Sequence, residues 1–389
     1  MTSMDLHSAR RHRSRRQLLD VIRQESGVTR ADLSLLTGLS RSAIADAVQD
    51  LLNDRLIAED VMDAGKGAGR GRPSALLVTA PARGNVVGID FGHDHVAVAV
   101  ADADGRVLDE QRTEAQVDTQ ARAALDTASG MVSRLLIGTG VSLSDVRAIA
   151  AGVPAPLDVR TKRIRSTSIM SDWADLNPGE ELSNRLGRQV ITANDADMGA
   201  QGELRFGAAR GLRDFIYVKA SEGLGASLVL NGSVYQGSGG LAGEIGHTQL
   251  SDQGAWCRCG NRGCLETVVS TTFVHDRMRE SRIEPTDAIH PLQDSAQHPV
   301  VARFVTESGR TLGKVLADVC NWLNPAAIIL GGELGTAGQP LVDGVAESIN
   351  RFTQPATAQA VDVRTAQLGM RSELLGAVAV AAQEALYLT

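Results

Sequence analysis

The sequence predicts an α/β protein of two parts, a small N-terminal winged helix-turn-helix domain followed by a larger, two-lobed α/β domain. The first part carries a helix-turn-helix pattern and two short strands, and the rest carries one strand–turn–strand pattern twice. We expect the first domain to span residues 1–82 and the second 83–389, with lobes near 83–205 and 206–389. A C-terminal helix could return to the first lobe.

Composition is that of an ordinary globular protein, but the charge is unevenly distributed. Of the 389 residues, 43% are hydrophobic, 22% are charged and only 3% are aromatic. The net charge of −7 conceals a net +2 in residues 1–80 and −9 in the remainder. A head with basic edges on an acidic body indicates nucleic-acid binding. The basic excess lies at Arg10, Arg11, Arg13, Arg15, Arg16, Lys66, Arg70 and Arg72.

The N-terminal segment MTSMDLHSARRHRSRRQLLD is basic, but it lacks the apolar stretch of an export signal. No window of the sequence reaches the ~18 uninterrupted apolar residues of a membrane helix. We therefore expect a cytoplasmic protein with no membrane partner. Thiols stay reduced in that compartment, where clustered cysteines more often bind metal than form disulfides.

A helix-turn-helix pattern fills the first half of the predicted head. Thr29 and Asp32 have the spacing of a capping box, Gly38 ends the first helix, and Ser40 is a natural N-cap for the second. The second helix has an apolar stripe of Ile44, Ala47, Val48 and Leu51. Such a helix reads the DNA major groove with its other face, although any small helical bundle could share the pattern. The candidate DNA-contacting residues are Ser40, Arg41, Ser42, Ala45 and Gln49.

The next segment predicts a β-wing. Strands are expected around residues 56–62 and 75–79, with a tip of glycine and basic residues between them. The tip carries Lys66, Arg70 and Arg72, which could reach phosphates or a narrow minor groove. The run Arg70-Gly71-Arg72-Pro73 also resembles the core of an AT-hook. A solvated surface turn is the alternative.

The segment CRCGNRGCLE at 257–266 places Cys257, Cys259 and Cys264 within ten positions. A tetrahedral zinc site needs a fourth ligand, and His247 is the best candidate. Cys320 lies in the apolar run VLADVCNWL and is predicted to be a buried core residue. We therefore expect one structural zinc ion per chain. A glycine-rich loop with crowded free thiols is the alternative.

The larger domain contains a duplicated strand pattern. VVGIDFGHDHVAVAVADADGRVLDEQR at 86–112 and DFIYVKASEGLGASLVLNGSVYQG at 214–237 each predict three strands joined by a glycine-rich turn and a second tight turn. Duplication of such a unit gives two lobes with a cleft between them. The two glycine-rich turns could then cradle phosphate across that cleft, although tight hairpins also explain the glycines.

Six motifs together resemble the ROK family of sugar kinases and sugar-responsive repressors over nearly the whole chain. They are GIDFG at 88–92, GVPAP at 152–156, ANDAD at 193–197, AGEIGH at 242–247, CRCGNRGCLE at 257–266 and NPAAIILGGEL at 324–334. The resemblance implies an actin-like, hexokinase-like (ribonuclease H-like) fold for the two lobes. Kinases of the family usually begin at the first strand unit, so the additional head resembles the repressor branch.

The resemblance also implies roles for individual residues. In the family, the residues matching His247, Cys257, Cys259 and Cys264 hold a structural zinc, which fixes a loop carrying sugar-binding groups. Carboxylates and an amide at fixed positions suit a polyol, which offers several hydrogen-bond donors. The implied sugar-binding residues are Asn194, Asp195, Glu244, His247 and Glu266.

The phosphate-binding turns depart from the kinase pattern. The family turns read D-x-G-G-T and G-T-G-x-G, whereas this chain has Asp90-Phe91-Gly92-His93-Asp94 and Ser221-Glu222-Gly223-Leu224-Gly225. An acid, Asp94 or Glu222, stands at each threonine position. Two like charges ~4 Å apart repel by about 4 kcal/mol at an effective dielectric constant near 20. We therefore expect no catalytic residue, although Asp195 would be the general base in a kinase.

The sequence thus predicts a sugar-responsive DNA-binding transcriptional regulator, most simply a repressor whose effector alters its operator affinity. A homodimer or homotetramer would read a roughly palindromic operator. One alternative is a ROK sugar kinase, phosphorylating a hexose with ATP, that gained a DNA-binding head. Another is a DNA-binding protein with no effector.

Overall fold

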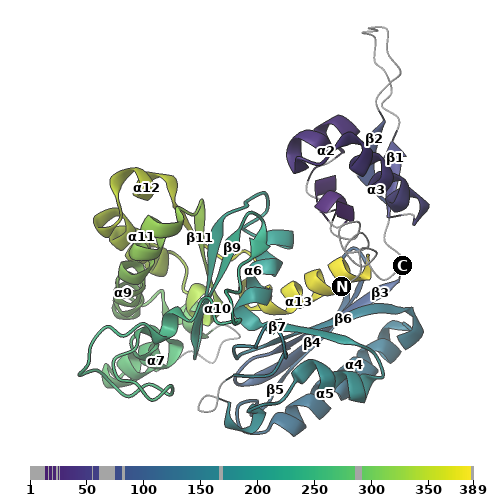
Figure 1. Ribbon diagram of the computed structural model, residues 1–389. Helices are drawn as coiled ribbons and strands as arrows, with labels where there is room; N and C mark the ends of the chain where they lie inside the picture. Colours follow the sequence, from purple (N-terminus) through teal and green to yellow (C-terminus); the bar gives the residue numbers. More distant parts are fainter. Residues whose placement is uncertain are drawn as a thin grey trace. The chain divides into compact units, whose positions relative to one another are not determined.

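The computed structural model describes residues 14–386 except 16, 20, 23–24, 26, 55, 61–74, 81–83, 166–169 and 285–290 (Figure 1). The chain divides into two compact units. The first comprises Met1–Arg83 together with Leu386–Thr389, and the second comprises Gly84–Ala385.

The first unit has the predicted helix-turn-helix. Helix α2 (Arg30–Thr37) begins with a complete capping box, in which the Thr29 hydroxyl accepts a hydrogen bond from Asp32 N and the Asp32 carboxylate accepts one from Thr29 N at 2.9 Å. The helix ends at Gly38, whose φ of 68° is left-handed and suits glycine. Helix α3 (Arg41–Asn53) begins at Ser40, whose side chain accepts from Ala43 N.

The predicted wing strands are also present. Strand β1 (Ile57–Asp60) pairs antiparallel with β2 (Leu76–Thr79), and Val28 adds an isolated bridge to Leu77. A single hydrophobic core holds the unit together. It contains Leu18, Leu19, Ile22, Val28, Leu33, Ile44, Ala47, Val48, Leu51, Leu56, Ile57, Leu77 and Leu386.

The second unit contains two five-stranded sheets with matching topology. The strand orders are β5-β4-β3-β6-β7 and β10-β9-β8-β11-β12. In each sheet the first three strands along the chain pair with one another antiparallel. The fourth strand pairs parallel with the first, and the fifth pairs parallel with the fourth, so the duplication predicted from the sequence is confirmed. The strands are β3 (Asn85–Phe91), β4 (His95–Asp102), β5 (Val107–Glu114), β6 (Val146–Val153), β7 (Val190–Asn194), β8 (Phe215–Ala220), β9 (Leu224–Leu230), β10 (Ser233–Val234), β11 (Ala327–Gly331) and β12 (Asp362–Thr365).

Helices cover both faces of each sheet (Figure 1). Helices α4 (Ala121–Thr139) and α5 (Pro178–Leu186) share a core with the outer face of the first sheet. Helices α7 (Thr271–Glu280), α9 (Pro299–Leu323) and α11 (Gln339–Phe352) do so for the second. The shorter elements are α8 (Pro291–Ser295), α10 (Gly332–Gly335), α12 (Pro355–Ala360), η1 (Leu143–Asp145), η2 (Ser171–Trp173), η3 (Ile245–His247), η4 (Leu265–Thr267) and η5 (Gly369–Arg371).

Two helices, α6 (Asp195–Phe206) and α13 (Ser372–Ala385), form the layer between the sheets. Helix α6 follows the last strand of the first sheet but packs mainly on β8 and β9 of the second, whereas α13 packs on β3 and β6 of the first. Small residues let the two helices touch. A Cβ on Gly376 would lie 1.7 Å from Met198 O, and one on Gly202 would lie 2.3 Å from Ser372 O.

A wholly buried carboxylate joins these two helices as well. Glu203 of α6 accepts hydrogen bonds from the backbone N–H groups of Gln367 and Leu368 and from the Ser372 hydroxyl at 3.1, 2.9 and 2.9 Å. These groups precede and begin α13. The carboxylate therefore fixes the start of α13 against α6, because an unpaired buried carboxylate would be costly.

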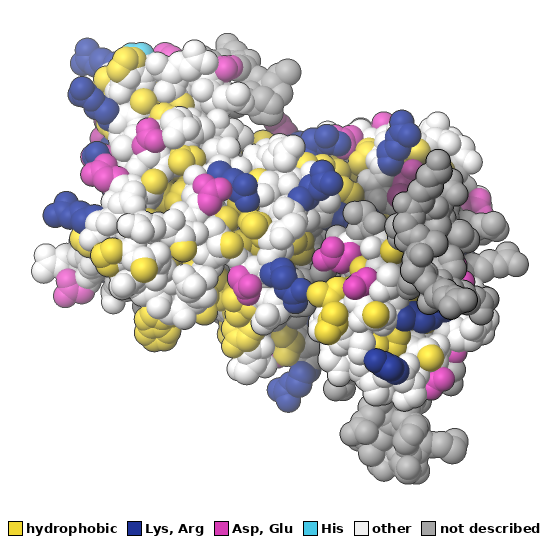
Figure 2. All heavy atoms as spheres, turned by 90° about the horizontal axis from the view of Figure 1, so that it is seen from above, with side chains coloured by type: hydrophobic (Ala, Val, Ile, Leu, Met, Phe, Trp, Pro, Cys, Tyr) yellow, Lys and Arg dark blue, Asp and Glu magenta, His cyan; other side chains and the backbone are white. Residues whose placement is uncertain are grey.

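Two surface properties of the described residues bear on the partners of the protein. Within the described ranges, no helix is both long and apolar enough to cross a membrane. On the face shown in Figure 2, Lys and Arg side chains of the described residues are interspersed with Asp and Glu.

The α6–α13 contact predicts a sharp difference between two glycine substitutions. We expect Gly376→Ala to lower the free energy of unfolding by about 2 kcal/mol or more, because the new methyl group collides with backbone that cannot move away cheaply. Chemical denaturation followed by circular dichroism measures the change.

Gly138→Ala is the matched control. This residue lies in α4, and an added Cβ meets nothing within 4 Å. It should leave stability unchanged or raise it by up to about 1 kcal/mol, the usual gain from glycine to alanine in a helix. Equal destabilisation by both substitutions would show that the close contact between α6 and α13 is not the reason why Gly376→Ala lowers stability.

Candidate functional site

The four predicted metal ligands lie together. The ligand atoms of His247, Cys257, Cys259 and Cys264 are all within 4.8 Å of one another. The Cys259 and Cys264 Sγ atoms are 3.7 Å apart, and Cys257 Sγ lies 3.6 Å from His247 Nδ1. Two thiolates bound tetrahedrally at ~2.3 Å from one ion would be about 3.8 Å apart, whereas a disulfide needs ~2.05 Å. The cluster therefore fits a tetrahedral metal ion.

Tight turns bring the cysteines to this point. Gly263 has φ 63°, and a Cβ there would lie 2.0 Å from Ser251 O, so the loop can fold back only on a glycine. Cys257 N donates to Asn261 O at 2.8 Å, and an isolated antiparallel bridge joins Gln249 to Cys264. Cys320, by contrast, is fully buried in α9 and belongs to the core of the second lobe.

Asn194 and Asp195 lie where β7 passes directly into α6. Asn194 is the N-cap, with its side-chain oxygen accepting from Ala196 N at 2.9 Å and its amide donating to Ala155 O at 3.3 Å. Asp195 Oδ2 accepts from Lys219 Nζ, at 2.5 Å. The side chains of Lys219 and Asp195 are only 12% and 9% exposed, so this is a buried ion pair.

Glu244 and Glu266 lie beside the metal cluster. Glu266 is buried, accepts from Leu224 N at 3.1 Å and lies 3.8 Å from Cys257 Sγ. Glu244 Oε2 lies 3.9 Å from His247 Nε2. Partial burial and then the charges of Asp195, Glu266 and Asp197 raise the pKa of Glu244 to about 7. The predicted sugar-binding acids are thus close enough to interact electrostatically.

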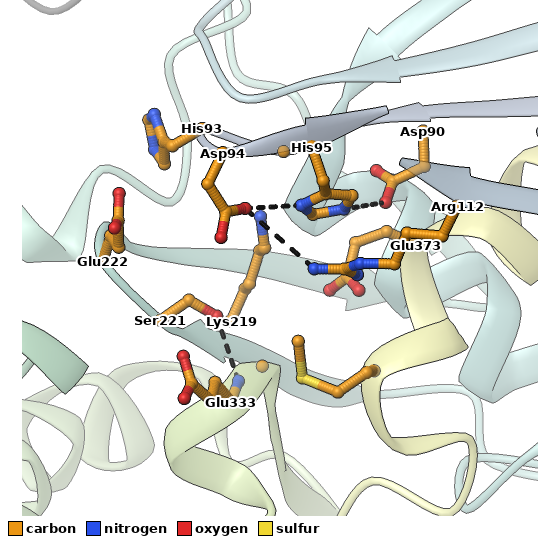
Figure 3. A pocket seen from close by; sticks show the side chains of 13 residues that line it. Asp90, His93, Asp94, His95, Arg112, Lys219, Ser221, Glu222, Glu333 and Glu373 are labelled. Carbon is orange, nitrogen blue, oxygen red and sulfur yellow. Dashed lines mark hydrogen bonds and ion pairs between the residues drawn. The ribbon is translucent and has the colours of Figure 1, made fainter. Parts of the chain in front are cut away.

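The first glycine-rich turn is filled by a side chain of its own (Figure 3). His95 Nδ1 lies 2.6 Å from Asp94 Oδ1 and its Nε2 lies 3.1 Å from Asp90 Oδ2. Burial opposes the charged imidazole, but these two carboxylates raise the pKa of His95 overall. In return, the hydrogen bond with His95 lowers the pKa of Asp94 to about 2. The imidazole lies over the backbone of Gly92, where a Cβ would be 2.0 Å from its Cε1.

A pocket between the two turns carries an excess of acids. Figure 3 shows Asp94, Glu222 and Glu333 facing it, with Lys219 and Arg112 among the basic residues. Burial, and then the charges of Asp94 and Glu222, raise the pKa of Glu333. The residues with carboxylates that line this pocket are Asp90, Asp94, Glu222, Glu333 and Glu373. The pocket thus gathers carboxylates from both lobes around one space.

Sequence reasoning did not anticipate several residues of this region. Lys219 interrupts the apolar strand FIYVKA, and an isolated lysine in a buried strand is itself a signal of a buried partner. Tyr217, on the same strand, donates to Glu373 at 2.7 Å, a contact across 156 positions that no local pattern reveals. Arg112 also lines the pocket, and Arg258 Nε lies 3.3 Å from Glu266 Oε1.

The candidate DNA-contacting residues of the head share one surface. Ser40, Arg41, Ser42, Ala45 and Gln49 are all exposed on or next to α3, whereas Ile44, Ala47, Val48 and Leu51 are buried. Gln49 Nε2 donates to Asn53 Oδ1 at 3.0 Å, which holds it along the helix surface. The wing residues Lys66, Arg70 and Arg72 lie outside the described residues.

Comparison with known proteins gives a consistent result along the chain. Residues 86–384 match the model of the ROK family, and residues 11–58 match a winged helix-turn-helix DNA-binding model. The xylose repressor of Bacillus spizizenii is 27% identical, with 92% of each chain covered. The DNA-binding transcriptional repressor Mlc of Escherichia coli is 27% identical, with 94% of this chain and 92% of the repressor covered. A glucokinase of Halalkalibacterium halodurans is 29% identical, but only 75% of this chain is covered.

Solved structures divide in the same way. The crystal structure of a ROK family transcriptional regulator, described as a homologue of Escherichia coli Mlc, has a TM-score of 0.75 at 26% identity and covers 96% of both chains. A ROK family glucokinase from Streptomyces griseus, in complex with glucose and AMPPNP, has a TM-score of 0.67 at 26% identity. It covers 76% of this chain and 99% of the glucokinase.

The metal cluster predicts the effect of removing one thiol. We expect Cys259→Ser to lose bound metal, because a serine hydroxyl is a poor replacement for a thiolate ligand. Inductively coupled plasma mass spectrometry of the reduced, purified protein should find about one zinc per chain before the substitution and much less after it.

Cys320→Ala is the control, since it removes a buried thiol far from the cluster in sequence. It should keep the metal and cost some stability through the cavity that it leaves. Metal-free wild-type protein, or full metal content in Cys259→Ser, would contradict the assignment.

Proposed function

The chain belongs to the ROK family, and on that premise we propose that it is a sugar-responsive transcriptional regulator, a repressor that acts in the cytoplasm. Its winged helix-turn-helix head binds operator DNA, and its ROK domain binds a sugar or sugar derivative that alters operator affinity. Relatives with both parts support this, because the repressors align over more than 90% of the chain whereas the glucokinase aligns over 75%.

The observation that carries the proposal is the buried ion pair between Lys219 and Asp195. A general base needs a carboxylate oxygen free to meet the sugar hydroxyl, whereas Asp195 Oδ2 already accepts a hydrogen bond from Lys219 Nζ at 2.5 Å. His95 occupies the first turn, and Asp94 and Glu222 line the pocket that polyphosphate would have to enter. These features favour binding of a sugar without its phosphorylation.

A polyol is the ligand class that the proposed site suits. Asn194, Asp195, Glu244, His247 and Glu266 offer carboxylates, an amide and an imidazole near one another, and carboxylates accept hydroxyl hydrogen bonds strongly. A zinc ion held by His247, Cys257, Cys259 and Cys264 would fix the loop that carries two of these acids. A rigid loop loses less entropy when the sugar binds.

The head determines the form of the DNA site. In a homodimer or homotetramer, paired heads related by two-fold symmetry would read a roughly palindromic operator. The exposed residues of α3 would contact bases, and Lys66, Arg70 and Arg72 of the wing would contact phosphates or the minor groove.

The second candidate is a ROK sugar kinase with an added head. Retention of Asp195 and the match to glucokinases support it. The two candidates differ in one measurable outcome, namely whether ATP is consumed.

We predict that one sugar changes operator affinity in the absence of ATP, and that Asp195→Asn abolishes this change. The coupling between two ligands of one protein is typically 1–3 kcal/mol, or about 5- to 150-fold in affinity. Fluorescence anisotropy with labelled operator, titrated with and without each sugar of a panel, measures the shift.

Asp252→Asn, an exposed acid of the second lobe, is the control and should keep the full response. Thermal unfolding should confirm that Asp195→Asn is folded, because this substitution leaves Lys219 without its partner. Sugar-dependent ADP release in a coupled assay, with the sugar that shifts operator binding, would instead establish the kinase.

A further prediction concerns the wing. Replacing Arg70 and Arg72 by alanine should weaken operator binding and reduce the dependence of log affinity on log salt concentration by about 0.9 for each lost phosphate contact. Arg106→Ala, an exposed arginine of the second unit, is the control. An unchanged salt slope in the wing variant would mean that the wing does not touch DNA.

A further inference from the structure

Arg258 stands between two predicted metal ligands, Cys257 and Cys259, and its guanidinium contacts three residues outside that set. Its Nη1 lies 3.8 Å from Asp118 Oδ2, its Nε lies 3.3 Å from Glu266 Oε1, and its Nη2 donates to Glu222 O at 3.2 Å. Asp118 belongs to the first lobe, whereas Glu222 and Glu266 belong to the second. A single guanidinium therefore joins the two lobes at the cleft.

The first lobe presents Asp118 in a fixed position. It follows Val117, which is fully buried and whose carbonyl accepts from Trp173 Nε1 at 2.7 Å. Asp118 Oδ1 lies 2.8 Å from His93 Nδ1, so the acid contacts both His93 of its own lobe and Arg258 of the other. The carboxylate is thus positioned from within the first lobe.

His93 makes a second contact between the lobes. It lies on the turn between β3 and β4, and a Cβ on Gly223 would be 2.9 Å from its Nε2 and 3.5 Å from Glu266 Oε2. The imidazole therefore rests against the backbone of the second glycine-rich turn. The side chains of His93, Asp118, Arg258 and Glu266 are 10%, 27%, 31% and 11% exposed, so water screens their interactions less than at an open surface.

We propose that His93, Asp118, Arg258 and Glu266 form a clasp that holds the two lobes together beside the pocket between the two glycine-rich turns. The chain's own charges then connect the two turns, and the cleft closes around a sugar without a second ligand. Arg258 is the positioning residue, because it orients Glu266 and ties it to Asp118. The sugar-binding consequence rests on the proposed function, whereas the clasp itself can be tested without sugar.

The sugar-free test uses hydrogen–deuterium exchange on the full chain. Leu224 N donates to Glu266, so exchange in a peptide covering residues 221–225 reports on the clasp. We expect Asp118→Asn and Arg258→Gln each to raise exchange in this peptide about fivefold or more. The Asp118 result is decisive, because Asp118 lies in the other lobe. If Arg258 and Glu266 acted only within the loop that carries the cysteines, Asp118→Asn would leave exchange in this peptide unchanged.

Arg262→Gln is the matched control. This arginine lies in the same loop, but its guanidinium stacks 3.9 Å above the Trp256 ring. It should leave exchange at 221–225 unchanged. Zinc content should be the same in all variants, which separates loss of the clasp from loss of the metal.

Sugar affinity gives the second readout, measured by calorimetry with the sugar that shifts operator binding. Each single variant should bind about fivefold or more weakly, and the double variant should lose clearly less than the product of the two single losses, because both variants remove the same Asp118–Arg258 contact. The proposal would be overturned if the two single losses of sugar affinity multiplied in the double variant, or if Arg258→Gln bound sugar as well as Arg262→Gln does. If no sugar affects the wild type, the proposed function fails, and the exchange experiment alone decides whether the clasp exists.

Discussion

The close contact of α6 with α13 is the constraint on which the larger unit depends. Each helix belongs by chain order to one lobe and packs mainly on the sheet of the other, so the lobes are joined by an exchange of helices. Gly202 and Gly376 allow backbone contact, and Glu203 supplies hydrogen bonds that a hydrophobic contact could not. The same contact holds the N-terminal end of α6, and therefore Asn194 and Asp195, at the cleft.

The cleft itself is organised by charges that are already paired. Lys219 is the partner of Asp195, His95 lies between Asp90 and Asp94, and Tyr217 donates to Glu373. Preformed pairs have two effects on a ligand. They fix acceptor oxygens in place for hydroxyl groups, and they engage the cationic side chains of Lys219 and His95, so a polyanion gains less from these two groups.

Sequence reasoning succeeded where the signal was local and failed where it was not. Thr29, Gly38 and Ser40 predicted the helix boundaries of the head because caps depend on neighbouring residues. The spacing of Cys257, Cys259 and Cys264 predicted the cluster, since tight turns bring close positions together. The partners of Lys219, Glu373 and Arg258 lie 24, 156 and 8 or more positions away, and only the folded chain brings them into contact. His95 was visible in the sequence, but its place over Gly92 follows from hairpin geometry.

The hydrophobic core of the N-terminal unit includes a residue that follows the larger unit in the sequence. Leu386, immediately after α13, belongs to the hydrophobic core of the N-terminal unit, beside Leu18, Leu33 and Leu51. The N-terminus leaves the ribosome first, so the core of the N-terminal unit stays incomplete until residue 386 has also emerged. In nascent chains that stop short of residue 386, the hydrophobic core of the N-terminal unit lacks one residue. Completion of the DNA-binding domain therefore depends on synthesis of the larger unit.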